Sequence, residues 1–364
     1  MDSIANHQKL ANEEENYLLV MELVQAPILP MVIRVAVELG VFDTIAKHGS
    51  GSQMSSKSIV FHLPTQNPNA ANLLDRILRL LCSYNILTSS MVTRNDGHVE
   101  RLYGLAPLCK FFLKDEDGFS LYTDILMFQE KAVMDGWGHL KDAILEGGTP
   151  FNNAHGMNVF EYAERDARFY QVMTAGMFNH TAIIMKKILE TYTGFENLRE
   201  IVDVGGGVGT SIGLITSKYP TIKGINFDLP HVVAHAPSYP GVKHVGGNMF
   251  ESIPSCETIF MKWILHDWSD EVVVDLLKNC YKALPDQGKV IVMDVILPAA
   301  IETNSTAKCA FLSDLLMMLG SEDGKERTEE EFFALAKEAG FVSAKKVCCV
   351  YNCWVMEFYK AQKN

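Results

Sequence analysis

The stretch Glu200-Ile201-Val202-Asp203-Val204-Gly205-Gly206-Gly207-Val208-Gly209-Thr210 decides the fold. A short apolar run is typical of a buried parallel strand, and this one ends in an acid followed by glycines. An amphipathic run begins near Thr210, so the stretch predicts a strand, a tight turn and a helix. Because glycine has no Cβ, such a turn lets a ligand approach the backbone. The stretch therefore predicts a nucleotide site at the carboxyl ends of a doubly wound sheet.

The spacing of the glycines distinguishes two classes of nucleotide ligand. The dinucleotide pattern G-x-G-x-x-G fits the run Gly205–Gly209 poorly. A second apolar strand ends at Asp228, and an acid at this place accepts hydrogen bonds from ribose hydroxyls in either class. S-adenosylmethionine has no pyrophosphate and does not need the helix N-terminus as an anion site. The compact turn therefore favours S-adenosylmethionine over a dinucleotide, and both over an ordinary glycine-rich loop.

Length and composition predict a globular protein with more than one domain. The chain has 364 residues, with 48% hydrophobic and 21% charged residues. Its formal net charge of −12 disfavours nucleic acid and anionic membranes as partners. No apolar run is long enough to span a bilayer and no signal peptide is evident, so we expect a cytoplasmic protein. The eight cysteines lack zinc-like spacing, and we expect reduced thiols and no metal.

The N-terminal part combines helical patterns with a β-hairpin signal. Ala71–Leu81 has the pattern of a strongly amphipathic helix. Two strand-like runs follow, Ile86–Thr93 and His98–Leu105, and Asn95-Asp96-Gly97 between them favours a hairpin. Helices followed by a hairpin resemble a winged-helix unit. Because neither the helix nor the chain is basic, we interpret the unit as a dimerisation module and not as a DNA-binding one.

The segment before this module is a candidate dimer interface. Apolar residues recur at helical spacing between Glu15 and Gly40, and Pro27 and Pro30 are expected to break or kink the helix. The same pattern also fits the core of the domain, so periodicity leaves both interpretations open.

The remainder of the chain predicts a helical segment and then a sheet. Residues 119–190 are helical in pattern and rich in methionine and aromatic residues, which form either core or an apolar pocket for a flat ligand. Strand–helix alternation after Ile201 predicts a parallel sheet. The predicted strands are Glu200–Val204, Lys223–Phe227, Lys243–Gly246, Glu257–Lys262, Lys289–Asp294, Lys345–Tyr351 and Trp354–Tyr359.

Two residues at neighbouring strand ends are candidates for acid–base chemistry. His266 follows the strand that ends at Lys262, and Asp294 ends the next strand. An acid beside a histidine holds the imidazole in one tautomer and stabilises its cation, which suits general base catalysis. A structural histidine and an ordinary strand-end acid remain the alternative.

Taken together, the ordered motifs of the chain resemble the plant caffeic acid O-methyltransferase family of S-adenosylmethionine-dependent methyltransferases. The likeness runs nearly from end to end. The motifs that carry it are Leu74-Asp75-Arg76-Ile77-Leu78-Arg79-Leu80-Leu81, Arg101-Leu102-Tyr103-Gly104-Leu105, Val202–Gly207, Asn226-Phe227-Asp228-Leu229-Pro230-His231, His244-Val245-Gly246-Gly247, Lys262-Trp263, His266-Asp267-Trp268-Ser269-Asp270-Glu271 and Gly324-Lys325-Glu326-Arg327-Thr328.

The resemblance implies an α/β fold in three parts. Residues 1–118 would form the winged-helix-like dimerisation domain of a homodimer. Residues 119–190 would form a helical linker that lines the substrate pocket, and residues 191–364 a Rossmann-like catalytic domain. The implied reaction is methyl transfer from S-adenosylmethionine to a phenolic hydroxyl of a small aromatic acceptor in plant specialised metabolism, without a metal.

The resemblance also assigns roles to individual residues. His266 would be the general base, with Asp294 and Glu326 on either side of it. The cofactor contacts would be Gly205, Asp228, Leu229, Asn248, Met249 and Lys262. The substrate pocket would be lined by Met127, Phe128, Val133, Phe169, Met173, Met177, His180, Asp267, Ser313, Leu316, Met317 and Ser321.

Several positions depart from the family pattern. Asp294 is usually Glu, and Asn248 stands where an adenine-binding acid is usual, so we expect weaker cofactor binding. Family members that methylate caffeate-like phenols have Asn in place of Phe128 and His in place of Ala163, which disfavours lignin monomers. Three classes stay open: an O-methyltransferase, an N-methyltransferase for an aromatic amine such as anthranilate, and a non-catalytic dimeric scaffold. Local resemblance to the anthranilate branch, for example at Met177–His180, supports the second class.

Overall fold

A computed structural model describes residues 2–361, with side chains from residue 12 onward. The chain divides into two compact units, Met1–Leu126 and Met127–Asn364. The three-part division expected at residues 118 and 190 remains a prediction. Most of the predicted helical linker falls within the second unit.

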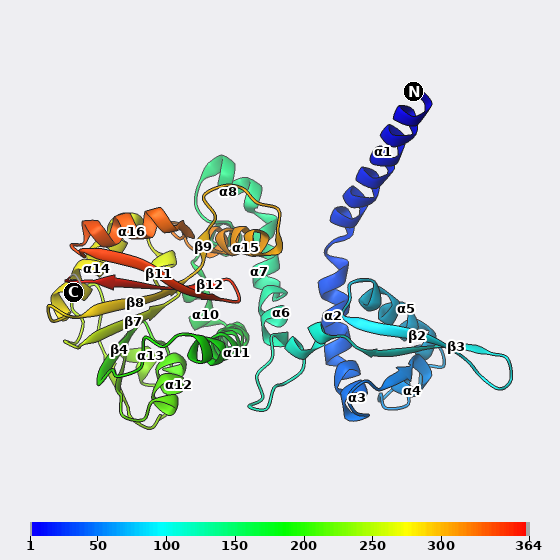
Figure 1. Cartoon of the computed structure of the whole chain (residues 1–364), viewed down its shortest axis with the longest axis horizontal. Coiled ribbons are helices and arrows are strands. Elements are labelled where there is room, and N and C mark those ends of the chain that lie inside the picture. The colour runs from blue at the N-terminus through cyan, green and yellow to red at the C-terminus, as the bar shows by residue number, and fades with distance from the viewer. Residues whose placement is uncertain (1, 362–364) are drawn as a thin grey trace. The chain divides into compact units, whose positions relative to one another are not determined.

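The first unit is helical with a small antiparallel sheet (Figure 1). The sheet has the order β1-β3-β2, and the predicted hairpin is confirmed as its β2–β3 pair. Leu74, Leu78 and Leu81 on α5 are buried in the core of this unit, as the amphipathic pattern predicts. The elements are α1 (Asp2–Gln25), α2 (Ile28–Glu38), α3 (Val41–Lys47), β1 (Gln53–Ser55), α4 (Ser56–Val60), α5 (Ala70–Ser83), β2 (Leu87–Thr93), β3 (Val99–Leu105), the 3₁₀ helix η1 (Pro107–Phe111) and α6 (Tyr122–Phe128), which continues into the second unit.

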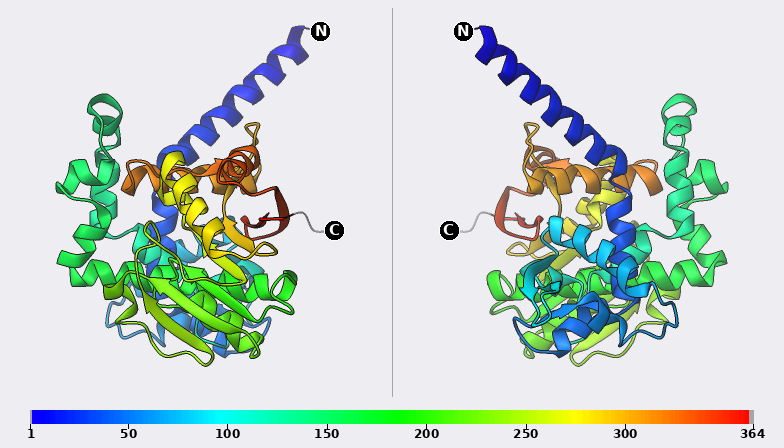
Figure 2. Two further views of the ribbon diagram at one scale, coloured as in Figure 1. Left: turned by 90° about the vertical axis from the view of Figure 1, so that its left-hand side faces the viewer. Right: turned by 90° about the vertical axis from the view of Figure 1, so that its right-hand side faces the viewer.

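Helices α1 and α2 meet at the predicted proline break. Their axes are bent by 51°, and Pro27 lies between them while Pro30 fits in the first turn of α2. Helix α1 projects away from the other elements of its unit (Figure 2). No single helix among the described residues is long and apolar enough to cross a membrane, whereas the bent pair Asn12–Gln25 and Ile28–Glu38 meets that test by length and composition alone.

The second unit is built around a seven-stranded sheet of order β11-β12-β8-β7-β4-β5-β6. Strands β6, β5, β4, β7 and β8 are parallel, as predicted, and the C-terminal pair β11–β12 is antiparallel. The strands are β4 (Glu200–Val204), β5 (Lys223–Asp228), β6 (Val242–Gly246), β7 (Thr258–Lys262), β8 (Lys289–Asp294), β11 (Ser343–Val350) and β12 (Cys353–Tyr359), and the two-residue strands β9 (Ile296–Leu297) and β10 (Arg327–Thr328) pair separately.

Helices cover both faces of this sheet (Figure 1). Because side chains alternate along a strand, Val290 and Val292 of β8 pack against α14 and α16, whereas Ile291 and Met293 pack against α11 and α12. The helices are α7 (Lys131–Gly138), α8 (Leu140–Glu146), α9 (Pro150–His155), α10 (Val159–Arg165), α11 (Ala167–Thr191), α12 (Thr210–Lys218), α13 (Pro230–Val233), the 3₁₀ helix η2 (Leu265–Asp267), α14 (Asp270–Ala283), α15 (Ser305–Gly320) and α16 (Glu329–Glu338). Both faces of β8 are therefore buried, and polar groups are presented at the strand ends.

Candidate active site

The glycine turn after β4 has no room for a Cβ at Gly205 or Gly206. Gly205, Gly207 and Gly209 have positive φ angles of 68°, 59° and 84°, which glycine adopts without strain. A Cβ on Gly206, whose φ is not in that region, would lie 2.1 Å from the Asn226 Oδ1 atom. The turn therefore presents bare backbone at the carboxyl end of β4, as the sequence predicts.

Asp228 connects this turn to the end of β5. Its Oδ2 atom accepts a hydrogen bond from the Gly207 N–H at 2.7 Å, and its Oδ1 atom accepts one from the Leu229 N–H at 2.7 Å. A carboxylate has about four acceptor sites, so both oxygens keep capacity for ribose hydroxyls. The turn and the predicted ribose-binding acid thus form one rigid assembly.

Asn248 follows β6 and is held by local hydrogen bonds. Its Oδ1 atom accepts from the Phe250 N–H at 3.0 Å, and its Nδ2 atom donates to Glu251 Oε1 at 3.2 Å. These bonds fix the orientation of the amide, so that its carbonyl oxygen has one acceptor position left for an adenine amine. Met249, the next predicted cofactor contact, packs against the core beside this turn.

Lys262 ends β7 in a desolvated place beside several acids. Burial lowers its pKa to about 8, although Asp203, Asp294 and Asp267 act in the opposite direction. Its Nζ atom lies 3.4 Å from the centroid of the Trp263 ring, a cation–π contact. Lys262 is therefore the cationic member of an otherwise acidic set of strand ends.

His266 lies next to both predicted partners. It sits on η2, just beyond β7, and only 8% of its surface is exposed. Its Nδ1 atom lies 3.1 Å from Glu326 Oε1 and 3.6 Å from Asp294 Oδ1. Its Nε2 atom lies 3.7 Å from Asp267 Oδ1. One nitrogen thus faces two buried carboxylates and the other faces Asp267.

The charges of this cluster set its protonation. Burial lowers the pKa of His266, but Asp294, the hydrogen bond to Glu326 and Asp267 outweigh it and raise that pKa to about 9. Burial also raises the pKa of Asp294, to about 7, while His266 acts against this shift. Among the described residues, neither oxygen of Asp294 has a hydrogen-bond partner, which makes this carboxyl depend on the imidazole beside it.

The same three side chains have the composition of a metal site. His266, Asp294 and Glu326 bring one potential ligand atom each within 4.8 Å of one another. The donor set alone therefore does not separate a base held by carboxylates from a metal centre.

The structure brings some of the predicted substrate residues close to His266. Ser313 on α15 donates to Glu326 Oε1 at 2.7 Å, and Ser321 donates to the Asp267 carbonyl at 2.9 Å. His180 on α11 contacts the Trp263 ring edge-on at 4.8 Å. Leu316 and Met317 are on α15, the helix that also carries Ser313.

Other predicted substrate residues belong to a helical cluster. Phe169 is 2% exposed and packs with Met173 and Val133 among the helices α7, α9, α10 and α11. Met127 packs against α11 beside Gly176. Phe128 and Met177 are the most exposed of the predicted set, at 38% and 42%. The departure at Ala163 is buried in the same cluster as Phe169.

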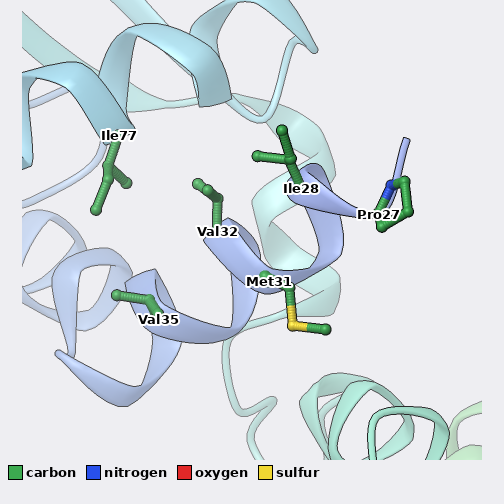
Figure 3. Close-up of a pocket in the computed structure, with 6 residues that line it drawn as sticks. All are labelled: Pro27, Ile28, Met31, Val32, Val35 and Ile77. Atoms are coloured by element: carbon green, nitrogen blue, oxygen red, sulfur yellow. The ribbon is translucent and has the colours of Figure 1, made fainter. Parts of the chain in front are cut away.

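Two cavities among the described residues lie elsewhere. One, of about 370 Å³, is lined by Pro27, by apolar side chains of α2 and by Ile77 (Figure 3). The other, of about 640 Å³, is lined by Lys289 and Glu357 among others. It lies at the amino ends of β7 and β8, whereas His266 and Asp294 lie at their carboxyl ends. Neither is lined by His266, Asp294 or Glu326.

Comparison with family models supplies the identification. Residues 137–342 match an O-methyltransferase domain, and residues 21–115 match an O-methyltransferase dimerisation domain. The chain belongs to the O-methyltransferase family. Among its relatives is a protein of Ocimum basilicum named caffeic acid 3-O-methyltransferase 1, which is 54% identical over 99% of this chain and 100% of the relative. Another is esculetin O-methyltransferase of Kitagawia praeruptora, 54% identical over 96% of each chain.

Solved structures with lower sequence identity share the fold. A methyltransferase of calicheamicin biosynthesis in its SAH-bound form has a TM-score of 0.78 and 24% identity, over 95% of this chain and 98% of that one. Human N-acetylserotonin methyltransferase in complex with SAM has a TM-score of 0.77 and 21% identity, over 95% and 98%. These likenesses confirm the predicted fold class, a methyltransferase sheet with an N-terminal helical unit.

Proposed function

We propose that this O-methyltransferase transfers a methyl group from S-adenosylmethionine to a phenolic hydroxyl of a small aromatic acceptor in plant specialised metabolism, with His266 as general base. The observation that supports the proposal best is the buried imidazole whose Nδ1 atom faces the carboxylates of Glu326 and Asp294. The names of the relatives, caffeic acid and esculetin O-methyltransferases, support a phenylpropanoid or coumarin type of acceptor.

The residues at the strand ends fit the cofactor. The bare backbone at Gly205 suits a close ligand, Asp228 retains acceptor capacity for ribose hydroxyls, and Asn248 retains one acceptor position for adenine. When bound, S-adenosylmethionine supplies a methyl group on a positively charged sulfonium. The acidic surroundings formed by Asp294 and Asp267 favour this positive charge.

The catalytic step follows from the two nitrogens of His266. The Nδ1–H group donates to Glu326, which leaves the Nε2 lone pair free to accept the proton of the phenol. As the proton leaves, the phenol oxygen gains the electron density needed to bond to the methyl carbon. The imidazolium that results is stabilised by Asp294 and Glu326. The carboxylates therefore orient the base and hold its charge.

The same geometry favours a phenol over an aromatic amine. An uncharged aniline already has a free lone pair, so methylation of its nitrogen needs less help from a buried base and two carboxylates. A non-catalytic scaffold would need neither this cluster nor the open backbone turn. The experiment below therefore also tests for N-methylation and for a non-catalytic scaffold.

Two further properties belong to the proposal. The dimerisation domain and the exposed apolar residues of α1 support a homodimer. A cytoplasmic location is also part of the proposal, and a fluorescent fusion in plant cells would test it.

The test uses His266→Gln with a panel of phenols and anilines and labelled cofactor. We expect phenol methylation to fall by about 10²–10⁴-fold, the usual contribution of a general base. SAH affinity by calorimetry should stay the same, and activity should survive EDTA, which separates the base cluster from a metal centre. Unchanged phenol turnover, or activity restricted to anilines, would contradict the proposal. Absence of SAH binding by the wild-type protein would support a scaffold.

A further inference from the structure

The short helix that carries His266 does not satisfy its own backbone. Helix η2 is only three residues long, so its carbonyl groups need partners from elsewhere. Four consecutive carbonyls, those of residues 265–268, accept hydrogen bonds from one segment, Ser321–Arg327. The donors are the Arg327 Nη1 atom to Leu265 at 2.7 Å, the Lys325 N–H to His266 at 2.9 Å, the Ser321 hydroxyl to Asp267 at 2.9 Å, and the Arg327 Nη2 atom to Trp268 at 2.6 Å.

Arg327 supplies the two outer bonds of this set and has no exposed surface. Its third nitrogen, Nε, donates to Asp270 Oδ1 at 2.8 Å, so every nitrogen of the guanidinium is bonded. The guanidinium is a planar fork with fixed distances between its donors. It therefore fixes the separation of two carbonyls that lie on either side of His266 along the chain. Lysine would carry the same charge but has a single donor nitrogen and cannot reproduce the fork.

The same segment also orients the imidazole. Glu326, next to Arg327, accepts the bond from the His266 Nδ1 atom. Glu326 is itself held by α15, through Ser313 at its Oε1 atom and through Asp314, which accepts from its N–H at 2.9 Å. Both the main chain and the ring of His266 thus take their position from one segment anchored on one helix.

We propose that Arg327 is a positioning residue for the reaction, which sets where the Nε2 atom of His266 lies relative to the acceptor hydroxyl. This inference rests on the proposed role of His266 as general base. A base is effective only within about 2.6–3.2 Å of the proton that it takes. A misplacement of about 1 Å costs roughly 10²-fold in rate. Arg327 touches neither acceptor nor cofactor in this role and acts through the backbone of η2.

The test is a double-mutant cycle of Arg327→Lys with His266→Gln, measured on a phenol that is not ionised at the assay pH. In the wild-type background we expect Arg327→Lys to lower kcat by about 10–100-fold, with KM and the Kd for SAH changed by less than about threefold. In the His266→Gln background the further loss should be less than about twofold, because no base is left to misplace. Equal losses in both backgrounds would overturn the inference.

A second acceptor separates positioning from a general structural role. A nitrophenol that is already ionised at the assay pH needs no base, so Arg327→Lys should leave its turnover within about threefold of wild type. An equal loss on both acceptors would again overturn the inference. Asp270→Asn is the control, because it weakens the third bond of Arg327 and the ion pair with Lys325 while it keeps both carbonyl bonds. Its kcat should stay within about threefold of wild type.

Two further comparisons cover a variant that does not fold and a failure of the proposed general base. If Arg327→Lys does not fold, Ser321→Ala enters the same cycle. It removes the bond to the Asp267 carbonyl together with the bond that the Ser321 hydroxyl accepts from the Gly324 N–H, and its smaller loss must also vanish in the His266→Gln background. If His266→Gln is as active as wild type on the un-ionised phenol, the proposed general base fails. A different result would be that Arg327→Lys lowers kcat by the same factor in both backgrounds. That result would keep His266 as the base and would contradict only the role of Arg327.

Discussion

At the residue scale, the surroundings of His266 predict a pH dependence of the reaction. The neighbouring carboxylates outweigh the effect of burial and raise the pKa of His266 to about 9, which favours the protonated imidazole at neutral pH when no cofactor is bound. A general base must be neutral, hence turnover should rise with pH up to the pKa in the substrate complex. The positive sulfonium of the cofactor disfavours imidazolium and moves that pKa downward.

Removing the Glu326 carboxylate should shift the pH range over which kcat rises. In Glu326→Gln the imidazolium loses a negative partner, so its pKa falls and the limb of kcat against pH shifts to lower pH. The plateau should also fall, because the ring is less well oriented. The measurement is kcat for a phenol acceptor from pH 6 to 10 (about the range in which a histidine base titrates), with NMR titration of His266 as the check. A limb that stays in place or moves to higher pH would contradict the assignment.

At the element scale, a buried ion pair fastens β12 to β8. Glu357 on β12 accepts from Lys289 on β8 and from the Tyr192 hydroxyl through Oε1, and from Tyr359 and Lys345 through Oε2. Burial alone would raise the pKa of Glu357, but the bonds to Lys289, Tyr192 and Tyr359 lower it to about 2. A lowered folded-state pKa gives stability that is present above the unfolded pKa of about 4.3 and is lost as pH falls towards 2.

Glu357→Gln should therefore destabilise the second unit at pH 7. The variant removes the carboxylate of a buried ion pair with Lys289, and breaking such a pair costs roughly 3–5 kcal/mol. Urea unfolding at pH 7 and at pH 4 measures this, and the gap between wild type and variant should narrow at the lower pH. Glu257→Gln is the control, since Glu257 is an exposed carboxylate at the same cavity. Equal stability of Glu357→Gln and wild type at pH 7 would refute the prediction.

The strands and the site residues differ in how well the sequence predicts them. Strands β4 and β8 have the predicted bounds, because each is an apolar run between clear breaks. Strand β1 was not predicted because three residues are too few to show a period of two. The proximity of His266 and Asp294 followed from neighbouring parallel strand ends. Glu326 came only from the family resemblance, since it is distant along the chain from both.

Arg327 shows the limit of such reasoning. It lies in the run Lys325-Glu326-Arg327, and a charged run in a loop usually indicates a solvated surface. Its complete burial depends on three acceptors, the carbonyls of Leu265 and Trp268 and the carboxylate of Asp270. Nothing in the local pattern encodes these tertiary partners, so only the structure identifies this residue.

At the scale of the whole molecule, α1 predicts the oligomeric state. Leu23 and Val24 are 74% and 68% exposed in the single chain, and Tyr17–Val20 are also exposed. Apolar surface of this extent is typical of an interface between subunits. Replacing Leu23 and Val24 together by Lys should convert the proposed dimer into monomer in sedimentation experiments. Phe61→Lys, at an equally exposed apolar position of the same unit, is the control and should remain dimeric. A dimeric double variant at the same concentration would contradict the assignment of α1.

The place of β12 in the sheet has a consequence for how the protein is made. This strand is synthesised after every other strand of the large sheet, yet it lies between β8 and β11 and pairs with β8 over six residues. A nascent chain that has reached only residue 350 presents an open β8 edge and still lacks Glu357, the carboxylate that pairs with Lys289. The first unit has its core complete by residue 126 and can fold while translation continues. The methyltransferase sheet, by contrast, closes only after Tyr359 has left the ribosome, so during synthesis its open edge is exposed to chaperones and to neighbouring nascent chains.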